Sequence, residues 1–408
     1  MSIENLDRRI IALRDEMIDL QVQLASIPAI APSSGGEGEA RKAEAVIAYL
    51  RSHGFTDLEV IKAPDLDAPA GFRPNILTRT RGRRSDRTVW IMSHLDVVPA
   101  GELSLWKGDP FKPWVESGKI YGRGVEDNQQ DLVASIFAVQ AFLDLGLLPA
   151  SDVGLAIVAD EETGSEKGLG YVLKHTEAFR PHDWIVVPDA GNEDGSLIEV
   201  AEKSILWLKF RTLGKQTHGS MPEKGINSFK AASFLVAELD GLYAAFPETD
   251  PLFDPPRSTF EPTKKEANVP NINTIPGEDV FYMDCRILPR YPVEAVEAKI
   301  REVASAVEKR FGVRVTVEDK QRAPAAPPTR PDAPVVRALV RAVRDVLGVT
   351  GRPMGIGGGT VAAHFRRAGF EAACWSKSDE TAHQPNEYCI IDNMVADARV
   401  FAHVLSQD

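Results

Sequence analysis

The chain has 408 residues, of which 43% are hydrophobic and 26% are charged, and this is the composition of a soluble globular protein of two or three domains. Its formal net charge of −12, from 47 basic and 59 acidic residues, argues against nucleic acid as a partner. No run of about 18 apolar residues occurs, so we expect no membrane-spanning segment.

The cysteines and the first residues of the chain indicate the cellular compartment. Cys285, Cys374 and Cys389 are odd in number and widely spaced, which predicts neither a disulfide framework nor a cysteine-rich zinc site. The opening MSIENLDRRI is charged and lacks the apolar stretch of a secretory signal. We therefore expect a cytoplasmic protein.

Residues 3–27 are predicted to form one amphipathic helix. Apolar residues recur at alternating spacings of three and four, at Ile3, Leu6, Ile10, Leu13, Met17, Leu20 and Leu24. Such a stripe is typical of a coiled-coil or dimer seam, and also of a helix packed on its own domain. We favour the second interpretation.

Strands and helices then alternate up to about residue 190. We predict strands at NILTRT (75–80), TVWIMS (88–93), VGLAIVAD (153–160) and DWIVVPD (183–189), and a helix at QDLVASIFAVQAFLDLG (130–146). The last two strands are continuous apolar runs that end in acids. This pattern favours a mostly parallel sheet that is covered by helices on both faces.

The pattern changes near residue 204. A strand (205–214), a helix (227–246), one or two strands (273–288), a helix (293–312) and a strand (313–319) give the ferredoxin-like order β-α-β-β-α-β. After the proline-rich segment APAAPPTRP, a helix, a glycine loop and the strand EAACWS resume the first pattern. We therefore predict that residues 204–318 are a domain inserted into a discontinuous domain of residues 1–203 and 319–408.

Five short motifs carry histidine or acidic residues, and three of them directly follow predicted buried strands. They are SHLD (His94, Asp96), GRGVEDN (Asp127), VADEET (Asp160–Glu162), VPDAG (Asp189) and TAHQPNE (His383, Glu387). Taken singly, each has a plain explanation, such as a surface histidine, a helix N-cap or a turn residue. Because ligands bind at the carboxyl ends of strands in an open α/β sheet, we expect the motifs to converge.

Converging carboxylates repel each other unless a cation neutralises them. Imidazole and carboxylate ligands together suit zinc, manganese or cobalt better than magnesium alone. The motifs therefore predict a divalent metal site.

The motifs SHLDVVP, GRGVEDN, DEETGS, PDAG, HGSMPEKGIN and AHQPNE follow one another in the order found in a known family. Together they resemble the co-catalytic zinc hydrolases that include succinyl-diaminopimelate desuccinylase, acetylornithine deacetylase, carboxypeptidase G and bacterial dipeptidases. The resemblance covers nearly the whole chain. It implies an α/β zinc-exopeptidase-like catalytic domain with a mixed, mostly parallel sheet, an inserted ferredoxin-like α+β lid or dimerisation domain, and a homodimer formed through that domain.

The resemblance also implies two divalent metal ions, with zinc expected and cobalt or manganese as alternatives. Their ligands would be His94, Asp127, Glu162, Asp189 and His383, with Asp127 shared between the two metals. Asp96 would orient the imidazole of His94, and Glu161 would be the general base. The family further implies a cis peptide bond between Asp127 and Asn128.

The substrate-contacting residues are implied in the same way. His218 would stabilise the oxyanion, although it could be an ordinary turn residue. Asn273 and Arg286 would contact the substrate, with Arg286 gripping a carboxylate; alternatively, Arg286 is a strand arginine paired with a surface acid. In GIGGGTVAAHF, the backbone of Gly358, Gly359 and Thr360 would receive an anion, or the loop is simply a helix start.

The sequence departs from the family at three places. Asn128, Gln129 and Gln130 follow Asp127, where a second aspartate and a lysine are common. Asp189 stands where desuccinylases and deacetylases usually have glutamate, and aspartate there is more typical of dipeptidases and aminopeptidases. Val361 follows the glycine loop in place of an acid.

We therefore expect a two-metal hydrolase that cleaves the amide bond of a small N-acyl amino acid bearing a free carboxylate. A dipeptidase or aminopeptidase of the same family is the alternative. From other classes, a non-catalytic binding protein on this fold and a structural protein with a single metal are the rivals. Glu161 argues against a pure binder, which needs no base beside its ligands.

Overall fold

The computed structural model describes residues 3–408, which form two compact units. The first unit comprises the chain up to Val200 together with Thr329–Met354 and Thr360–Asp408. The second comprises Ala201–Pro328 and Gly355–Gly359. Residues 204–318, expected as the inserted domain, lie within the second unit.

The first unit is built on an eight-stranded mixed sheet with the order β1-β2-β6-β3-β7-β16-β8-β15. These strands are β1 (Asp57–Pro64), β2 (Phe72–Thr80), β6 (Ser151–Val158), β3 (Arg84–His94), β7 (Trp184–Gly191), β16 (Ala372–Ser376), β8 (Leu197–Glu202) and β15 (Arg352–Ile356). The four central strands, β6, β3, β7 and β16, run parallel. The strands β1, β2 and β8 join them by antiparallel pairing. The predicted α/β class with a mixed sheet is confirmed.

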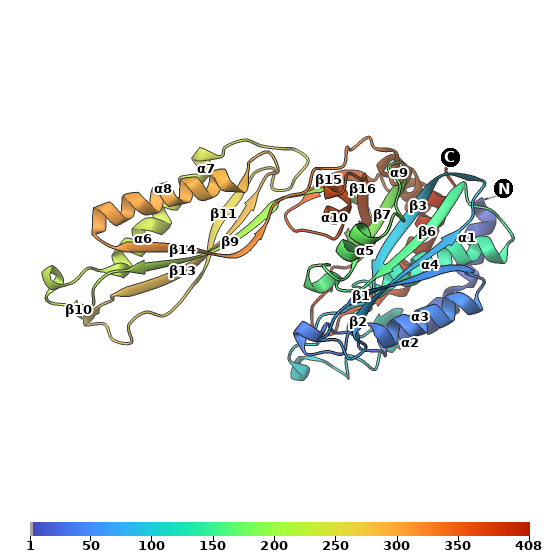
Figure 1. Ribbon diagram of the computed structural model, residues 1–408, viewed down its shortest axis with the longest axis horizontal. Helices are drawn as coiled ribbons and strands as arrows, with labels where there is room; N and C mark the ends of the chain where they lie inside the picture. The colour runs from blue at the N-terminus through green and yellow to red at the C-terminus, as the bar shows by residue number, and fades with distance from the viewer. Residues whose placement is uncertain (1–2) are drawn as a thin grey trace. The chain divides into compact units, whose positions relative to one another are not determined.

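Helices cover this sheet, which is why its central strands are continuously apolar. One layer contains α4 (Gln129–Asp144), α9 (Pro334–Leu347) and α11 (Ile391–Leu405), and α3 (Ala40–Ser52) packs on β2. Two further helices, α5 (Leu169–His175) and α10 (Ala362–Arg367), share a core with Trp90 and Met92 of β3. Both lie beside β7 and β16 in Figure 1.

The expected single helix over residues 3–27 is wrong in one detail. The structure has α1 (Ile3–Ala12) and α2 (Arg14–Ala25), with Leu13 between them. The Leu13 N–H is shared between the carbonyls of Arg9 and Ile10, a tightening that interrupts the regular helix. The apolar stripe is buried, and both helices pack on α4 and α11 of the same unit. Packing on its own domain, rather than a dimer seam, accounts for the stripe.

The second unit has a four-stranded antiparallel sheet with the order β11-β13-β9-β14. Its main elements follow the chain as β9 (Ser204–Leu213), α6 (Ser228–Leu239), α7 (Leu242–Ala245), β11 (Thr259–Lys265), β13 (Glu278–Ile287), α8 (Val293–Phe311) and β14 (Arg314–Ala323). The helix expected over residues 227–246 is divided at Gly241, a poor helix former. Stacked Phe210 and Phe281 anchor the core beneath α6 and α8.

Smaller elements complete the two units. In the first, β17 (Tyr388–Ile390), β5 (Lys119–Tyr121) and β4 (Trp114–Glu116) form a three-stranded sheet. In the second, β10 (Thr217–His218) pairs with β12 (Thr274–Ile275). The 3₁₀ turns are η1 (Pro32–Ser34), η2 (Leu103–Leu105), η3 (Glu161–Thr163) and η4 (Pro222–Lys224). Within residues 3–408, no helix is both long and apolar enough to cross a lipid bilayer.

Candidate metal centre

The carboxyl ends of three neighbouring parallel strands carry most of the predicted site. His94 ends β3, η3 with Glu161 and Glu162 follows β6, and Asp189 lies near the end of β7. Since β6, β3 and β7 are adjacent in the sheet, these side chains meet at one edge, as expected. Asp127 reaches the same place just before α4, and His383 does so from the loop between β16 and β17.

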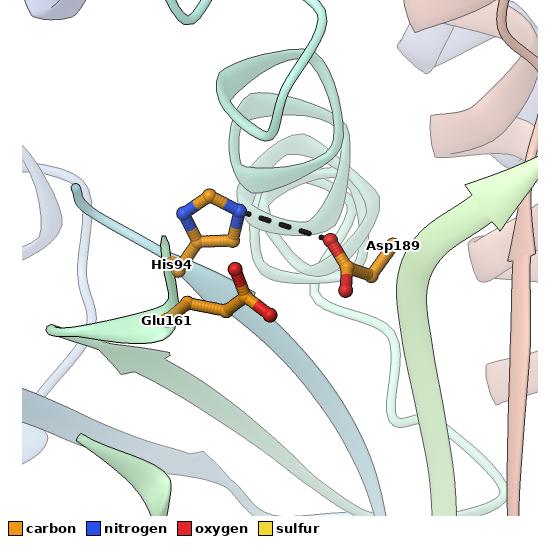
Figure 2. Close-up of side chains that lie close together, drawn as sticks. All are labelled: His94, Glu161 and Asp189. Carbon is orange, nitrogen blue, oxygen red and sulfur yellow. Dashed lines mark ion pairs between the residues drawn. The ribbon is translucent and has the colours of Figure 1, made fainter. Parts of the chain in front are cut away.

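Two groups of ligand atoms converge there. One consists of His94, Glu161 and Asp189, and the other of His94, Asp127 and Glu162; within each group all ligand atoms lie within 4.8 Å of one another. Figure 2 shows the first group, with the imidazole of His94 and the two carboxylates facing each other. His94 Nε2 lies 3.8 Å from an oxygen of Asp189. The sequence predicts Glu161 only as a base, and its presence in a ligand group comes from the geometry.

Asp127 lies between the two histidines. Its Oδ1 is 3.0 Å from Nε2 of His94, and its Oδ2 is 3.1 Å from Nε2 of His383. One carboxylate therefore presents an oxygen to each imidazole, which is the arrangement needed to share it between two cations. His383 also contacts Glu162 at 3.1 Å, while Oε1 of Glu162 is buried without a hydrogen-bond partner among residues 3–408.

The electrostatics of the centre reflect burial and crowded carboxylates. Burial raises the pKa of Glu161 well above its usual range, and the nearby charge of Asp189 adds to the rise. Burial likewise raises the pKa of Asp189 to about 7. Burial opposes ionisation of Asp127 too, but hydrogen bonds from His383 and His94 hold its pKa below the ordinary value. Hydrogen bonds to Asp127 and Glu162 raise the pKa of His383 to about 10.

These residues fit a pair of divalent cations. Several acids converge with two imidazoles, and the buried Oε1 of Glu162 receives no donor from the described part of the chain. Oxygen and nitrogen ligands of this kind suit zinc, cobalt or manganese. The individual role of each residue as a ligand stays a prediction.

Asp96 connects two parts of the centre. Its backbone oxygen is 3.0 Å from Nδ1 of His94, and its carboxylate Oδ1 lies farther away, at 3.5 Å. The carboxylate accepts hydrogen bonds from the backbone N–H groups of Glu161 at 3.1 Å and Glu162 at 3.0 Å. The orienting contact to His94 that we expected from the carboxylate is therefore made mainly by the backbone, while the carboxylate holds η3.

Asn128 ties the neighbouring strands together. Its Oδ1 accepts the backbone N–H of His94 at 3.2 Å, and its Nδ2 donates to the carbonyl of Pro188, the residue before Asp189. The peptide bond between Asp127 and Asn128 is cis, as predicted.

A pair of acids with no assigned role in the sequence motifs forms a reciprocal clasp, which we call the Glu126–Glu387 clasp. Glu387, from the His383 loop, accepts N–H donors from Gly124 and Glu126 at 3.0 Å, from Asp127 at 3.2 Å and from the guanidinium of Arg123 at 2.5 Å. In return, Glu126 accepts from the His383 loop.

The carboxylate of Glu126 accepts hydrogen bonds from the backbone N–H of Asp379 at 2.8 Å and from both the backbone N–H and the hydroxyl of Thr381. Each of the two loops that carry predicted ligands is therefore held by an acid from the other. The only signal in the sequence is that both acids sit inside the ligand motifs, GRGVEDN and TAHQPNE.

Of the predicted substrate residues in the second unit, His218 and Arg286 lie on strands and Asn273 directly precedes β12; all three are exposed or partly exposed. β10 and β12 place His218 opposite Thr274, next to Asn273, and Nδ1 of His218 contacts the Ser220 hydroxyl at 2.8 Å. Arg286 pairs with both oxygens of Asp284, at 2.7 and 3.0 Å, and donates to the carbonyl of Gly357 at 2.9 Å. The alternative interpretation of Arg286, a strand arginine paired with an acid, describes these contacts.

The glycine loop is open. A side chain at Gly357 or Gly358 would meet no atom of residues 3–408 within 4 Å, and one at Gly359 would come no nearer than 3.9 Å to Glu202. Thr360 Oγ1 lies 3.4 Å from Sγ of Cys374. The backbone of Gly358 and Gly359 is thus accessible, while its role in anion binding stays a prediction.

Comparison with known proteins bears on the identity of this centre. The chain is 39% identical to an uncharacterized metallohydrolase of Methanococcus maripaludis, over 97% of this chain and 99% of that one. It is 25% identical to a succinyl-diaminopimelate desuccinylase of Acinetobacter baylyi, over 97% and 99% of the two chains. Human carnosine dipeptidase 1 shares the fold, with a TM-score of 0.75 at 19% identity over 100% of this chain and 98% of that one. Residues 90–407 match peptidase family M20/M25/M40, and the chain belongs to this family of metallohydrolases.

Proposed function

We propose that this metallohydrolase cleaves the amide bond of a small N-acyl amino acid that carries a free carboxylate. The observation that carries the proposal is Glu161, a partly buried acid that faces His94 and Asp189 without being needed to complete the expected ligand set. A relative named as a succinyl-diaminopimelate desuccinylase supports the choice of a deacylation reaction.

The proposed metal ligands are His94, Asp127, Glu162, Asp189 and His383, with Asp127 shared. Two divalent cations held there, with zinc first and cobalt or manganese as alternatives, would polarise the scissile carbonyl and make the attacking water more acidic. The site residues do the rest of the chemistry.

Glu161 is proposed as the general base. It accepts a proton from the attacking water and later gives it to the leaving amine. A base whose pKa is raised above the ordinary carboxylate value is suited to both tasks, because it holds the proton more firmly until the leaving amine takes it. Burial supplies this rise for Glu161.

His218 is proposed to donate a hydrogen bond to the oxyanion as it develops. Its Nδ1 is engaged by Ser220, which leaves Nε2 for the substrate. Asn273, beside it on the β10–β12 ribbon, is proposed as a second polar contact.

Arg286 is proposed to bind the free carboxylate of the substrate. Of the five N–H donors of a guanidinium, Asp284 takes two and the Gly357 carbonyl a third. Two donors are left, although Asp284 offsets the positive charge. The preference for a free carboxylate should therefore be modest, and it is the part of the proposal most directly open to test.

A dipeptidase or aminopeptidase is the alternative, favoured by Asp189 in place of glutamate. A free amine on the substrate would then be a requirement. The binding-protein alternative predicts no turnover of any amide. Glu161 argues against it.

A hydrolysis panel tests these alternatives. Protein loaded with zinc, cobalt or manganese is offered N-succinyl-diaminopimelate, N-acetylornithine, other N-acetyl amino acids and dipeptides, each with a free or an amidated carboxyl end. We expect kcat/KM to be highest for an N-acyl amino acid and to fall on amidation. Turnover of dipeptides alone would replace the deacylase proposal by the peptidase one. Equal cleavage of free and amidated substrates would remove the proposed role of Arg286.

A further inference from the structure

A buried polar group at the first turn of α4 has no part in the proposed mechanism. It lies where α4 meets α11 and the end of β16, and the residues Gln130, Asp131 and Asp397 are at most 2% exposed. Gln130 belongs to the segment in which the sequence departs from its family, and Asp131 follows it directly. The chemistry of this group therefore calls for its own account.

Each carboxyl group has one satisfied oxygen. The Ser376 hydroxyl donates to Oδ2 of Asp131 at 2.7 Å, and Nε2 of Gln130 donates to Oδ2 of Asp397 at 2.7 Å. The same Gln130 nitrogen donates to the backbone carbonyl of Lys377 at 2.9 Å. The end of β16 is thereby attached to α4 and, through Asp397, to α11.

The other oxygen of each carboxyl group receives no donor from the described residues. Oδ1 of Asp131 and Oδ1 of Asp397 are both buried without a hydrogen-bond partner in residues 3–408, yet the two side chains lie within hydrogen-bonding reach of each other. Two ionised carboxylates in such contact, away from water, repel strongly. One proton between them converts the repulsion into an O–H···O⁻ hydrogen bond, which is among the stronger kinds.

We propose that Asp131 and Asp397 are a proton-sharing acid pair, which carries one negative charge and fixes the start of the segment that leads from Lys377 to His383. The cation that acts on the pair is Lys377, whose Nζ contacts Oδ1 of Asn393 at 2.7 Å and whose charge favours ionisation of Asp397. Glu126 and Asp189 act in the opposite sense on Asp131. The charge of Lys377 thus favours one negative charge on the pair.

The protonation of the pair predicts how stability depends on pH. Burial and the mutual repulsion of the two carboxylates raise the pKa at which the pair gives up its shared proton, to about 8 for Asp397. In the unfolded chain both carboxyl groups are ionised above about pH 4. Between about pH 4 and about pH 8 the folded protein therefore binds more protons, so its stability falls as the pH rises through this range.

Loss of the shared proton also bears on the metal centre. A second negative charge would push α4 away from α11 and release the end of β16, which precedes the His383 loop. This step rests on the proposed role of His383. The protonation of the pair itself does not, and the first two measurements below test it without turnover.

Asp397→Asn is the decisive variant in the metal-loaded, full-length protein. Its amide nitrogen donates to Asp131 as the shared proton does, and its amide oxygen still accepts from Gln130, but it does not titrate. We expect the melting temperature of the wild type to fall relative to that of the variant as the pH rises from about 4 to about 8, and the difference to level off above that. A protonated-carboxyl band in the infrared spectrum should be present in the wild type at neutral pH and weaker in the variant.

The exposed acid Asp15 supplies a matched control, because Asp15→Asn changes the charge of the same unit equally. It should leave the pH dependence of melting parallel to that of the wild type. Asp131→Asn replaces the other acid of the pair by an amide and should have the same effect. It tests the proposal if Asp397→Asn does not fold. The alkaline limb of the kcat profile should move to higher pH in either amide variant.

Two results would overturn the proposal. The first is a melting profile of Asp397→Asn and Asp131→Asn that runs parallel to the wild type across the whole range. The second is selective stabilisation of the wild type by sodium or potassium but not by a bulky organic cation, because a bound cation would then occupy the place of the shared proton.

Discussion

The carboxylate of Asp96 accepts the backbone N–H of Glu161 at 3.1 Å, so the residue that follows the metal-ligand candidate His94 by two positions also holds the proposed base. Its second oxygen accepts the N–H of Glu162 at 3.0 Å. A single side chain therefore fixes η3 relative to β3. Because a catalytic base must be held closely in position, this contact connects the strand end with the chemistry.

Replacing the base should separate catalysis from metal binding. We expect Glu161→Ala to retain two metal ions per chain and to lose kcat by ~10²–10⁴-fold, the usual contribution of a general base. Metal content by mass spectrometry and steady-state kinetics provide the measurements. Glu166→Gln, an exposed acid in the same loop, is the control and should keep full activity. Full activity of a metal-replete Glu161→Ala would rule out this assignment.

Substituting Asp96 should weaken both metal binding and catalysis. In Asp96→Asn, the amide nitrogen would face a backbone N–H of η3, so one hydrogen bond would become a contact between two donors. Residues that support metal ligands in this way typically contribute ~10–100-fold to affinity or activity. We expect a loss of kcat of that order together with weaker metal retention in a competition with a chelator. Loss of kcat with unchanged metal affinity would show that Asp96 positions the proposed base Glu161 and does not support the metal ligands.

The Glu126–Glu387 clasp should contribute mainly to stability. Glu387→Gln removes the negative charge paired with the buried guanidinium of Arg123, and losing one charge of a buried ion pair costs about 3–5 kcal/mol. Denaturant unfolding would measure the loss. Asp86→Asn, which breaks an exposed pair with Arg84, is the control and should show no measurable change. A similarly small effect at Glu387 would mean that the loops are held by other contacts.

The sequence predicted the residues of the candidate site better than the contacts that hold them in place. Strand ends such as His94 and Asp189 are readable because apolar runs end there and a parallel sheet brings those ends together. The partners of Glu387 lie more than 200 positions away, and no local pattern links them. The contact between Arg286 and Asp284 depends on the alternation of side chains in β13, and the break at Leu13 on a shared hydrogen bond. The contacts of Glu387 are therefore set by tertiary packing, whereas the other two features are local.

An ion pair at the start of the chain should govern part of the acid stability. Burial disfavours ionisation of Asp7, but hydrogen bonds from His403 and Arg399 of α11 lower its pKa to about 2. Since the ordinary value is about 3.9, the contact stabilises the fold above that pH and is lost as the pH falls toward about 2. Asp7→Asn should reduce the melting temperature at neutral pH and flatten the acid limb. Parallel acid limbs for the variant and the wild type would contradict the assignment.

Whether His218 acts within its own chain is a question that two inactive variants can answer. The family resemblance implies a dimer formed through the second unit, in which one chain supplies its histidine to the site of the other. His218→Ala and Glu161→Ala should each be inactive as homodimers. If His218 acts in the site of the partner chain, a hybrid dimer contains one site in which both His218 and Glu161 are intact.

Mixing the two variants under conditions that allow subunit exchange should then restore activity, to at most about half of the hybrid's sites. The expected signal is turnover that rises with the time allowed for exchange and vanishes when exchange is blocked by cross-linking. The double variant His218→Ala/Glu161→Ala mixed with either single variant is the control, since no intact site can form. A confirmed dimer that exchanges subunits without any recovery would place His218 in its own chain's site or outside catalysis. Light scattering that shows only a monomer would exclude the exchange altogether, because a single chain must then supply every group that the reaction uses.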